Sequence, residues 1–177
     1  MTIKSTFEEC LLIGTNAMST LTSSLEDEKF TEQLEAAVNL IHEINGRLVI
    51  SGMGKSGIIG KKLVATFAST GTPSLFLHPA EASHGDLGMV CEDDVLLLMS
   101  FSGESRELVD IIRYGKRFGV PIIAFTANAN STLGKAADIL LELPKVKESC
   151  PHNLAPTSST LIQLALGDAL AITLLKE

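Results

Sequence analysis

Apolar side chains recur at helical spacing through the first 45 residues. One series comprises Phe7, Leu11, Leu12 and Met18, and a second comprises Leu34, Val38, Ile41 and Ile44. Between them, the stretch "TSSLEDE" at 22–28 supplies the hydroxyl and acidic residues that are typical of a helix start. The pattern therefore predicts a pair of N-terminal helices within residues 1–45.

From residue 46 the pattern changes to short apolar runs that alternate with amphipathic segments. The predicted strands are 47–52, 73–78, 94–100, 120–127 and 138–143, and the predicted helices are 55–70, 105–119, 131–137 and 157–177. Strands that are apolar on both faces and separated by helices are typical of a parallel sheet covered on both sides. We predict an α/β fold, a three-layer αβα sandwich whose five-stranded parallel sheet has the flavodoxin-like order 2-1-3-4-5.

This organisation indicates one domain over 1–177, with residues 46–177 as its doubly wound core. The connection 79–93, "PAEASHGDLGMVCED", is expected to be a loop. The last helix is apolar on most sides, which is typical of a helix buried in its own core or against a neighbouring subunit.

Composition narrows the class of protein without identifying it. The chain has 177 residues, of which 45% are hydrophobic and 20% charged, a profile of soluble globular proteins. Its net charge of −7 disfavours nucleic acid and anionic membranes as partners. Apolar runs such as Val95–Met99 are too short to cross a bilayer, and the N-terminus lacks a signal-peptide pattern, so we expect a cytoplasmic protein. Cys10, Cys91 and Cys150 are expected to be reduced thiols.

A glycine-rich turn, "SGMGKSG" at 51–57, follows the first predicted strand. Its glycines match G-x-G-x-x-G and its end matches the G-K-S of a triphosphate loop. Val49 stands where a triphosphate loop needs its first glycine, and His78 ends the strand where a dinucleotide site needs an acid. The triphosphate loop is therefore rejected and the dinucleotide site is disfavoured. Three interpretations remain: a small phosphate site, a dinucleotide site, or a tight turn chosen for packing.

A second polar turn, "SFSGES" at 100–105, follows the third predicted strand. In the order 2-1-3-4-5 the first and third strands are neighbours, and ligands bind in the crevice beyond their carboxyl ends. Two helix N-termini would then meet there, with Ser56, Ser102 and Ser105 as hydroxyl donors for a phosphate monoester. The alternative for these serines, and for Thr157 and Ser158 at the last helix, is ordinary N-capping.

The two turns, Gly52-Met53-Gly54-Lys55-Ser56 and Ser100-Phe101-Ser102-Gly103-Glu104-Ser105, resemble the phosphosugar-binding elements of the sugar isomerase (SIS) domain. In addition "ATFASTGTPS", "HPAEASHGDLGM", "KESCP" and "LAPTSST" occur in an order similar to that of arabinose 5-phosphate isomerases. The resemblance implies interconversion of D-ribulose 5-phosphate and D-arabinose 5-phosphate, a step toward the lipopolysaccharide and capsule sugar Kdo, by a homotetramer. The sequence departs from the family pattern in three ways. It has the SIS domain without the pair of CBS domains found in many members, and it lacks the later "S-H-P-G" segment of the family. In addition, Phe101 stands where the family often has a polar residue.

The resemblance also implies roles for individual residues. The catalytic positions are Lys55, His84, Glu107 and Glu148, and His78 matches a histidine implicated in inhibitory zinc binding. The substrate-binding positions are Gly52, Gly54, Ser56, Gly71, Thr72, Ser100, Ser102, Gly103 and Ser105, and the hydroxyl cluster that opens the last helix adds Thr157 and Ser158 from the residues themselves.

Aldose–ketose isomerisation moves a proton between C1 and C2 and needs a base, a group that handles the O1 and O2 protons, and stabilisation of an enediolate. We assign Glu148 as the base and His84 as the acid and base for oxygen, with Lys55 as an electrostatic group. From the residues alone, Glu148 would be a solvated loop acid between Lys145 and Lys147.

Glu107 would be a first-turn helix acid on the same evidence.

The chemistry requires no cofactor or metal, and His78 alone cannot define a zinc site. The alternatives are another phosphosugar isomerase of this family and a non-catalytic phosphosugar-sensing module.

Overall fold

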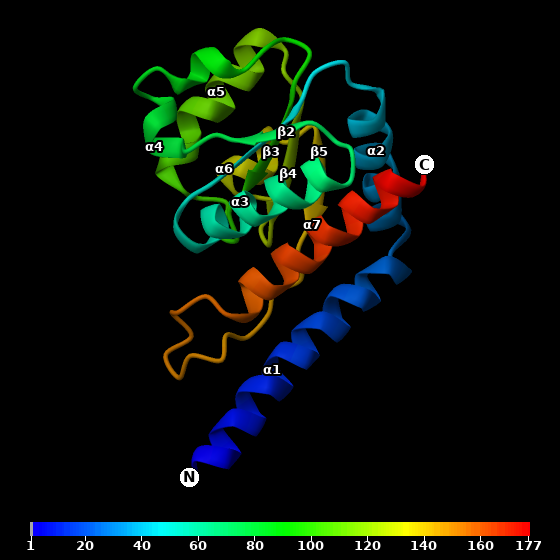
Figure 1. Ribbon diagram of the computed structural model, residues 1–177. Helices are drawn as coiled ribbons and strands as arrows, with labels where there is room; N and C mark the ends of the chain where they lie inside the picture. Colours follow the sequence, from blue (N-terminus) through cyan, green and yellow to red (C-terminus); the bar gives the residue numbers. More distant parts are fainter. Residues whose placement is uncertain (1) are drawn as a thin grey trace.

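A computed structural model describes residues 2–177 of the chain. Its elements are, in order, α1 (Ile3–Ser23), η1 (Ser24–Glu26), α2 (Glu28–Glu43), β1 (Leu48–Gly52), α3 (Gly54–Ser69), β2 (Ser74–Phe76), α4 (Pro79–Ala82), η2 (Asp86–Met89), β3 (Val95–Met99), η3 (Arg106–Leu108), α5 (Val109–Phe118), β4 (Ile122–Thr126), α6 (Thr132–Ala136), β5 (Ile139–Glu142) and α7 (Ser158–Lys176). Figure 1 shows the sheet between helices on its two sides.

The sheet confirms the predicted topology. Its five strands are parallel and lie in the order β2-β1-β3-β4-β5. Every residue of β1, β3 and β4 is buried, as expected for a parallel sheet that is covered on both faces. The pairing of Gly52 with Met99 places the carboxyl ends of β1 and β3 side by side.

Alternation along the strands divides the core into two clusters, one on each face of the sheet. One face packs against α1, α2, α3 and α7 through residues such as Phe30, Leu63 and Leu166. The opposite face packs against α5 and α6 through Ile111 and Leu133. The three-layer prediction is therefore confirmed.

The predicted N-terminal helical pair is present, but the large apolar side chains in the first half of α1 are mostly exposed. Ile3, Phe7 and Leu11 are 83%, 67% and 70% exposed, whereas Ala17 and Leu21 farther along α1 are buried. Figure 1 shows the N-terminal end of α1 projecting beyond the sheet and its covering helices. The projecting half consequently presents an apolar stripe to solvent.

Helix α7 is the one helix in residues 2–177 that is long and apolar enough to cross a membrane by length and composition, a test that core helices also pass. Residues 158–176 meet the length and hydropathy requirements of a membrane span, with a mean hydropathy of 1.5. In the fold, this helix lies against α3, and a side chain at Gly167 would overlap Leu63. Its buried residues include Ile162, Leu166 and Leu170, which belong to the core.

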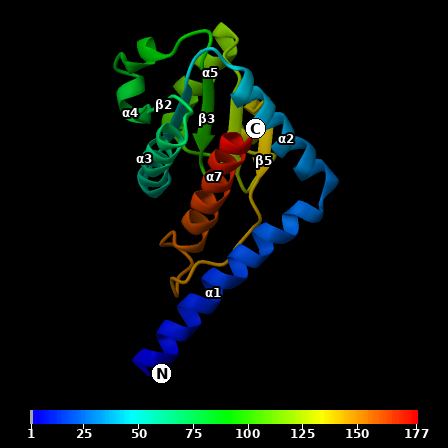
Figure 2. The ribbon, with the colours of Figure 1, turned by 45° about the vertical axis from the view of Figure 1, so that its right-hand side comes forward.

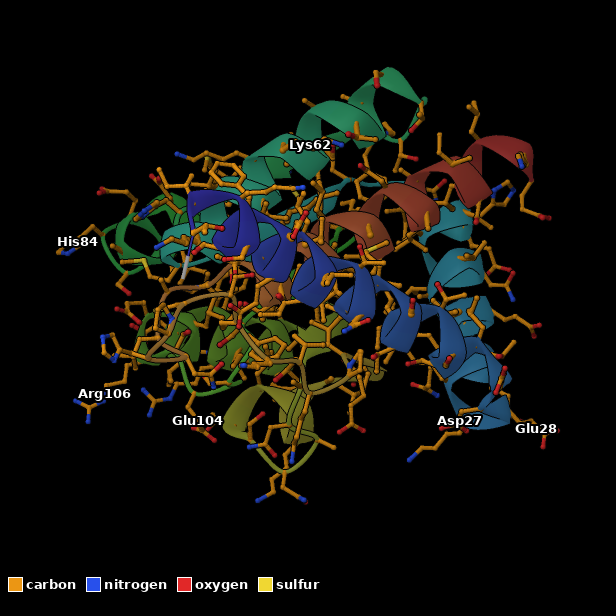
Figure 3. All side chains as sticks on the ribbon, turned by 90° about the horizontal axis from the view of Figure 1, so that it is seen from below. Asp27, Glu28, Lys62, His84, Glu104 and Arg106 are labelled. Atoms are coloured by element: carbon orange, nitrogen blue, oxygen red, sulfur yellow. The ribbon has the colours of Figure 1, made fainter. Side chains whose placement is uncertain are left out.

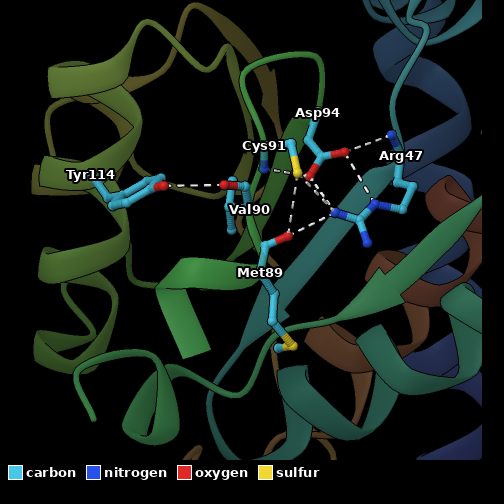
Figure 4. A network of polar contacts seen from close by, with 6 residues as sticks. All are labelled: Arg47, Met89, Val90, Cys91, Asp94 and Tyr114. Atoms are coloured by element: carbon cyan, nitrogen blue, oxygen red, sulfur yellow. Dashed lines mark hydrogen bonds and ion pairs between the residues drawn. The ribbon is translucent and has the colours of Figure 1, made fainter. Parts of the chain in front are cut away.

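The segment expected to be a loop, 79–93, contains the short helices α4 and η2. Its far end is fixed by Asp94, which accepts hydrogen bonds from the Arg47 backbone (2.8 Å), Arg47 Nη2 (2.9 Å) and the Cys91 backbone (2.9 Å). Arg47 Nη2 also donates to the Met89 carbonyl at 2.7 Å (Figure 4). This network joins the amino ends of β1 and β3. The short helices in segment 79–93 could not be predicted from periodicity, because each has four residues and the segment is largely polar.

Candidate functional site

The turn between β1 and α3 leaves backbone donors unused at the carboxyl end of the sheet. Met53 occupies the N-cap position without a side-chain cap bond, and Gly54 adopts φ +58°. A side chain at Gly57 would overlap the carbonyl of Gly52, so the packing interpretation holds for that glycine. Lys55 is exposed and Ser56 is half-buried. The first amides of α3 are therefore available to an anion, as the phosphate interpretation requires.

The turn after β3 is held by its own serines. Ser100 Oγ lies 2.9 Å from Ser105 Oγ and accepts a hydrogen bond from the Gly103 amide at 3.1 Å. Ser105 occupies the N-cap position of η3 without a side-chain cap bond, so the capping interpretation is wrong for it. Ser102 is exposed, and its hydroxyl accepts a 3.3 Å hydrogen bond from the Glu104 amide. Of these hydroxyls, that of Ser102 is the most accessible to a ligand.

Glu104 and Gly103 attach this turn to α6, a connection that the sequence pattern did not indicate. The Glu104 carboxylate accepts hydrogen bonds from the Thr132 amide (2.9 Å) and hydroxyl (2.8 Å), which lower its pKa. Gly103 adopts φ +73°, and a Cβ there would overlap the Ser131 hydroxyl. The contact between Glu104 and Thr132 spans 28 positions, and no local motif predicts a contact over that separation.

Glu148 is a buried carboxylate rather than the solvated loop acid that its neighbours suggested. It is 7% exposed. Its Oε2 atom accepts hydrogen bonds from the Thr157 amide (2.7 Å), the Thr157 hydroxyl (2.9 Å) and the Ser159 amide (3.3 Å). Burial raises the pKa of Glu148, but the hydrogen bonds from Ser159 and Thr157 outweigh burial and hold the pKa below its usual value. Within residues 2–177, all three of these hydrogen bonds fall on Oε2 and none on Oε1, while the Ser159 side chain also acts on the carboxyl to lower its pKa.

The capping interpretation of Thr157 and Ser158 is wrong as well. Thr157 occupies the N-cap position of α7, but its side chain makes no cap bond to the helix. Instead, its hydroxyl accepts from the Ser149 amide (2.9 Å) and donates to Glu148. Ser158 Oγ is buried and has no partner in the part of the chain that the structure describes. The helix start is thus capped by Glu148, nine positions earlier in the chain.

The loop that carries Glu148 lies at the same end of the molecule as the two glycine turns. Figure 2 shows β3 pointing toward this lower end, where the loop before α7 and the first half of α1 are found. The loop contacts α1 directly, because Ser149 Oγ donates to the Cys10 carbonyl at 3.3 Å. Asn153, in the left-handed region at φ +52°, accepts from the Glu148 amide at 2.8 Å. The backbone and side chain of Glu148 are therefore both restrained.

Three other predicted catalytic residues are exposed. Lys55, His84 and Glu107 all lie at the surface, and Figure 3 shows His84 pointing outward from the edge of the molecule. Gly71 and Thr72 precede β2 at the opposite end of the sheet, where they line a cavity of about 500 Å³. One chain thus does not bring all the predicted residues together, and their roles stay predictions.

Residues 40–173 match the family model of the SIS domain. The chain belongs to the SIS domain family. An Escherichia coli CFT073 protein solved in complex with arabinose 5-phosphate has a TM-score of 0.87 and 37% identity, covering 99% of this chain and 93% of that one. This level of coverage confirms the predicted family and fold.

The relatives with established names are longer than this SIS domain. Arabinose 5-phosphate isomerase of Pseudomonas aeruginosa is 55% identical over 140 residues, which cover 79% of this chain and 43% of the relative. An Escherichia coli arabinose 5-phosphate isomerase is 54% identical over 145 residues, covering 82% and 46%. The chain therefore spans less than half the length of these relatives.

His78 of this SIS domain does not by itself form a zinc site. Its Nδ1 atom is buried and has no hydrogen-bond partner among the described residues 2–177, and its ring lies edge-on to Phe76 at 6.3 Å between centroids. No three His, Cys, Asp or Glu side chains in residues 2–177 are grouped so that they could hold a metal. A zinc ion at His78 would need additional ligands, since zinc takes three or four protein ligands.

Proposed function

We propose that this SIS domain is an aldose–ketose isomerase that interconverts D-ribulose 5-phosphate and D-arabinose 5-phosphate, a step toward Kdo. Similarity to named arabinose 5-phosphate isomerases supports the substrate class. The observation that carries the proposal is the Glu148 carboxylate, which is buried, ionised and held through three hydrogen bonds on Oε2. Such a group is suited to removing a proton from carbon.

The phosphate of the sugar is proposed to bind between the two polar turns. The free amides at the start of α3 and the exposed hydroxyl of Ser102 supply donors, and Lys55 supplies a positive charge. Helix N-termini favour anions because unpaired N–H groups and the helix dipole point toward them. A local anion site of this kind is compatible with the net charge of −7 of the whole chain.

The proton transfer follows from the ionised state of Glu148. Its Oε1 removes the C2 proton of the aldose while O1 gains a proton, and a cis-enediol forms. O2 then gives up its proton and C1 receives one, which yields the ketose. His84 transfers the oxygen protons, Lys55 stabilises the enediolate, and Glu107 is the second candidate carboxylate. A lowered pKa makes Glu148 a weaker base, which its fixed orientation offsets.

We further propose a homo-oligomer, a tetramer by resemblance. The apolar stripe of Ile3, Phe7 and Leu11 supports a partner surface, and His84 points away from its own chain. Light scattering at micromolar concentration tests this, and a monomer would contradict it. The protein is proposed to be cytoplasmic, to need no cofactor, and to bind inhibitory zinc only if a neighbouring chain supplies ligands to His78.

A coupled assay over pentose and hexose phosphates tests the function. The proposal predicts turnover of D-ribulose 5-phosphate and D-arabinose 5-phosphate, and an increased KM in Ser102→Ala. Turnover only of other sugar phosphates would assign another isomerase activity. Binding of a phosphosugar without turnover would support a sensing module instead.

A further inference from the structure

Thr157 uses both of its polar groups to hold one oxygen of Glu148. Its amide donates to Oε2 at 2.7 Å and its hydroxyl donates to the same atom at 2.9 Å. A hydroxyl has one proton, and the Ser149 amide already donates to this oxygen at 2.9 Å. The hydroxyl proton of Thr157 therefore points toward Oε2 of Glu148.

This geometry leaves the Thr157 hydroxyl no proton for a sugar or a phosphate. We propose that Thr157 is a positioning residue that orients the Glu148 carboxylate for proton transfer and does not bind the substrate. The inference rests on the proposed function, because it takes Glu148 as the base. It replaces the substrate-binding role that the sequence predicted for Thr157.

The Thr157 hydroxyl acts on the carboxylate together with other restraints, which include a hydrogen bond from the Ser159 side chain. Asn153 holds the Glu148 backbone, and the Ser159 amide reaches Oε2 at a longer distance of 3.3 Å. The amide and the hydroxyl of Thr157 both donate to Oε2, and these are the two shortest hydrogen bonds to that atom. Displacement of a catalytic group by about 1 Å costs on the order of 100-fold in rate. Loss of the hydroxyl should therefore reduce turnover more than binding.

The experiment compares Thr157→Val with Thr157→Ser and Thr173→Val. Valine keeps the amide donor and the shape but removes the hydroxyl, while serine restores it. Thr173 lies on the same helix, and its hydroxyl donates to the Ala169 carbonyl at 2.9 Å, with no other side-chain bond in the part of the chain that the structure describes. We expect Thr157→Val to lower kcat roughly 10- to 100-fold, with KM within about threefold of the parent value. Thr157→Ser and Thr173→Val should stay within about threefold in both constants.

The outcomes separate this inference from the proposed function. An increased KM with unchanged kcat in Thr157→Val would mean that Thr157 binds the sugar, and unchanged constants would mean that its hydroxyl is dispensable. Either result overturns the inference. If the valine variant does not fold, Thr157→Ala removes the same hydroxyl and carries the same comparison.

A carbon-13 NMR titration of the Glu148 carboxyl provides a readout that does not depend on activity. Removal of the Thr157 hydroxyl should raise the pKa of Glu148 toward its ordinary value, because a bond to the charged form is lost. The charged groups on the same loop, Lys145, Lys147 and His152, are unchanged in this comparison. If the wild-type protein is inactive but the pKa of Glu148 still rises in the Thr157 variant, the proposed function is contradicted, whereas the hydrogen bond between Thr157 and Glu148 is supported. An unshifted titration would contradict the positioning role.

Discussion

Asp94 and Glu148 are two buried carboxylates at opposite ends of the same sheet. Both oxygens of Asp94 are occupied: Oδ1 accepts from the Arg47 backbone and Nε, and Oδ2 accepts from Arg47 Nη2 and the Cys91 amide. Glu148 accepts three hydrogen bonds from Thr157 and Ser159 on Oε2. The hydrogen bonds of the first group are spread over both oxygens, whereas these three bonds of the second fall on one oxygen.

The two carboxyls share the same balance of forces. In each, burial raises the pKa, and hydrogen bonds lower it by more. Asp94 has the guanidinium of Arg47 as a charged partner, while Glu148 is held by neutral donors from Thr157 and Ser159. The Asp94–Arg47 ion pair links two segments of the fold, whereas we propose that the Glu148 carboxylate takes part in chemistry.

The largest effect should distinguish the two carboxylates by catalysis. Glu148→Gln keeps an acceptor oxygen for Thr157 and Ser159 but cannot take a proton, so we expect kcat to fall about 10³-fold. Asp94→Ala should leave kcat per folded molecule within a few-fold of the parent. Steady-state kinetics, normalised to folded protein by circular dichroism, measures both. Equal losses in the two variants would remove the distinction between them.

The next effect should distinguish them by stability. Asp94→Ala leaves Arg47 partly buried without its partner, and we expect the free energy of unfolding to fall by about 3 kcal/mol. Glu148→Gln keeps its acceptor at the start of α7 and should lose only about 1 kcal/mol. Urea unfolding gives both values. A greater loss in Glu148→Gln would show that Glu148 serves mainly as a helix cap.

Acid should weaken the fold through both carboxyls. Their pKa values are lowered in the folded state, so their contribution is complete above the unfolded values of about 3.9 and 4.3. It is lost as the pH falls through the folded values. We expect the Tm to decrease below about pH 4.5, and to decrease less steeply in Asp94→Ala than in the parent. Parallel Tm profiles in the two proteins would contradict this source of acid sensitivity.

The smallest effect is expected from an exposed ion pair, which is neither buried like Asp94 nor proposed to take part in catalysis like Glu148. Lys62 Nζ lies 2.5 Å from Asp168 Oδ2, with side chains 47% and 36% exposed. Solvent screens such pairs, so Lys62→Ala should change the free energy of unfolding by less than about 1 kcal/mol. A loss as large as that of Asp94→Ala would mean that exposure does not separate these interactions.

The strands, their order and the N-terminal helical pair could be predicted because periodicity reports burial directly. Val95–Met99 is apolar at every position, and it is a central strand. The segment 79–93 was mispredicted as a loop, since four-residue helices such as Pro79–Ala82 are too short for a periodic signal. The exposure of Phe7 was also hidden, because an apolar stripe looks the same whether its own chain or another surface covers it.

The candidate site was predictable only in part. The glycine turns and Ser102 follow from motifs beside strands. The contact of Glu148 with Thr157 depends on how the loop between them folds, with Asn153 in the left-handed region. No residue pattern records that geometry, so the sequence suggested a solvated acid and a helix cap.

The Oε1 oxygen of Glu148 is proposed to move a proton between C1 and C2 of a pentose phosphate. Exchange of that substrate proton with deuterium oxide, followed by NMR in the parent and in Glu148→Gln, observes this step itself. We predict exchange in the parent and its loss in Glu148→Gln, with phosphosugar affinity by calorimetry nearly unchanged. Near-normal exchange in Glu148→Gln would assign the base elsewhere, with Glu107 the next carboxylate to test, and no exchange in the parent would contradict isomerase activity.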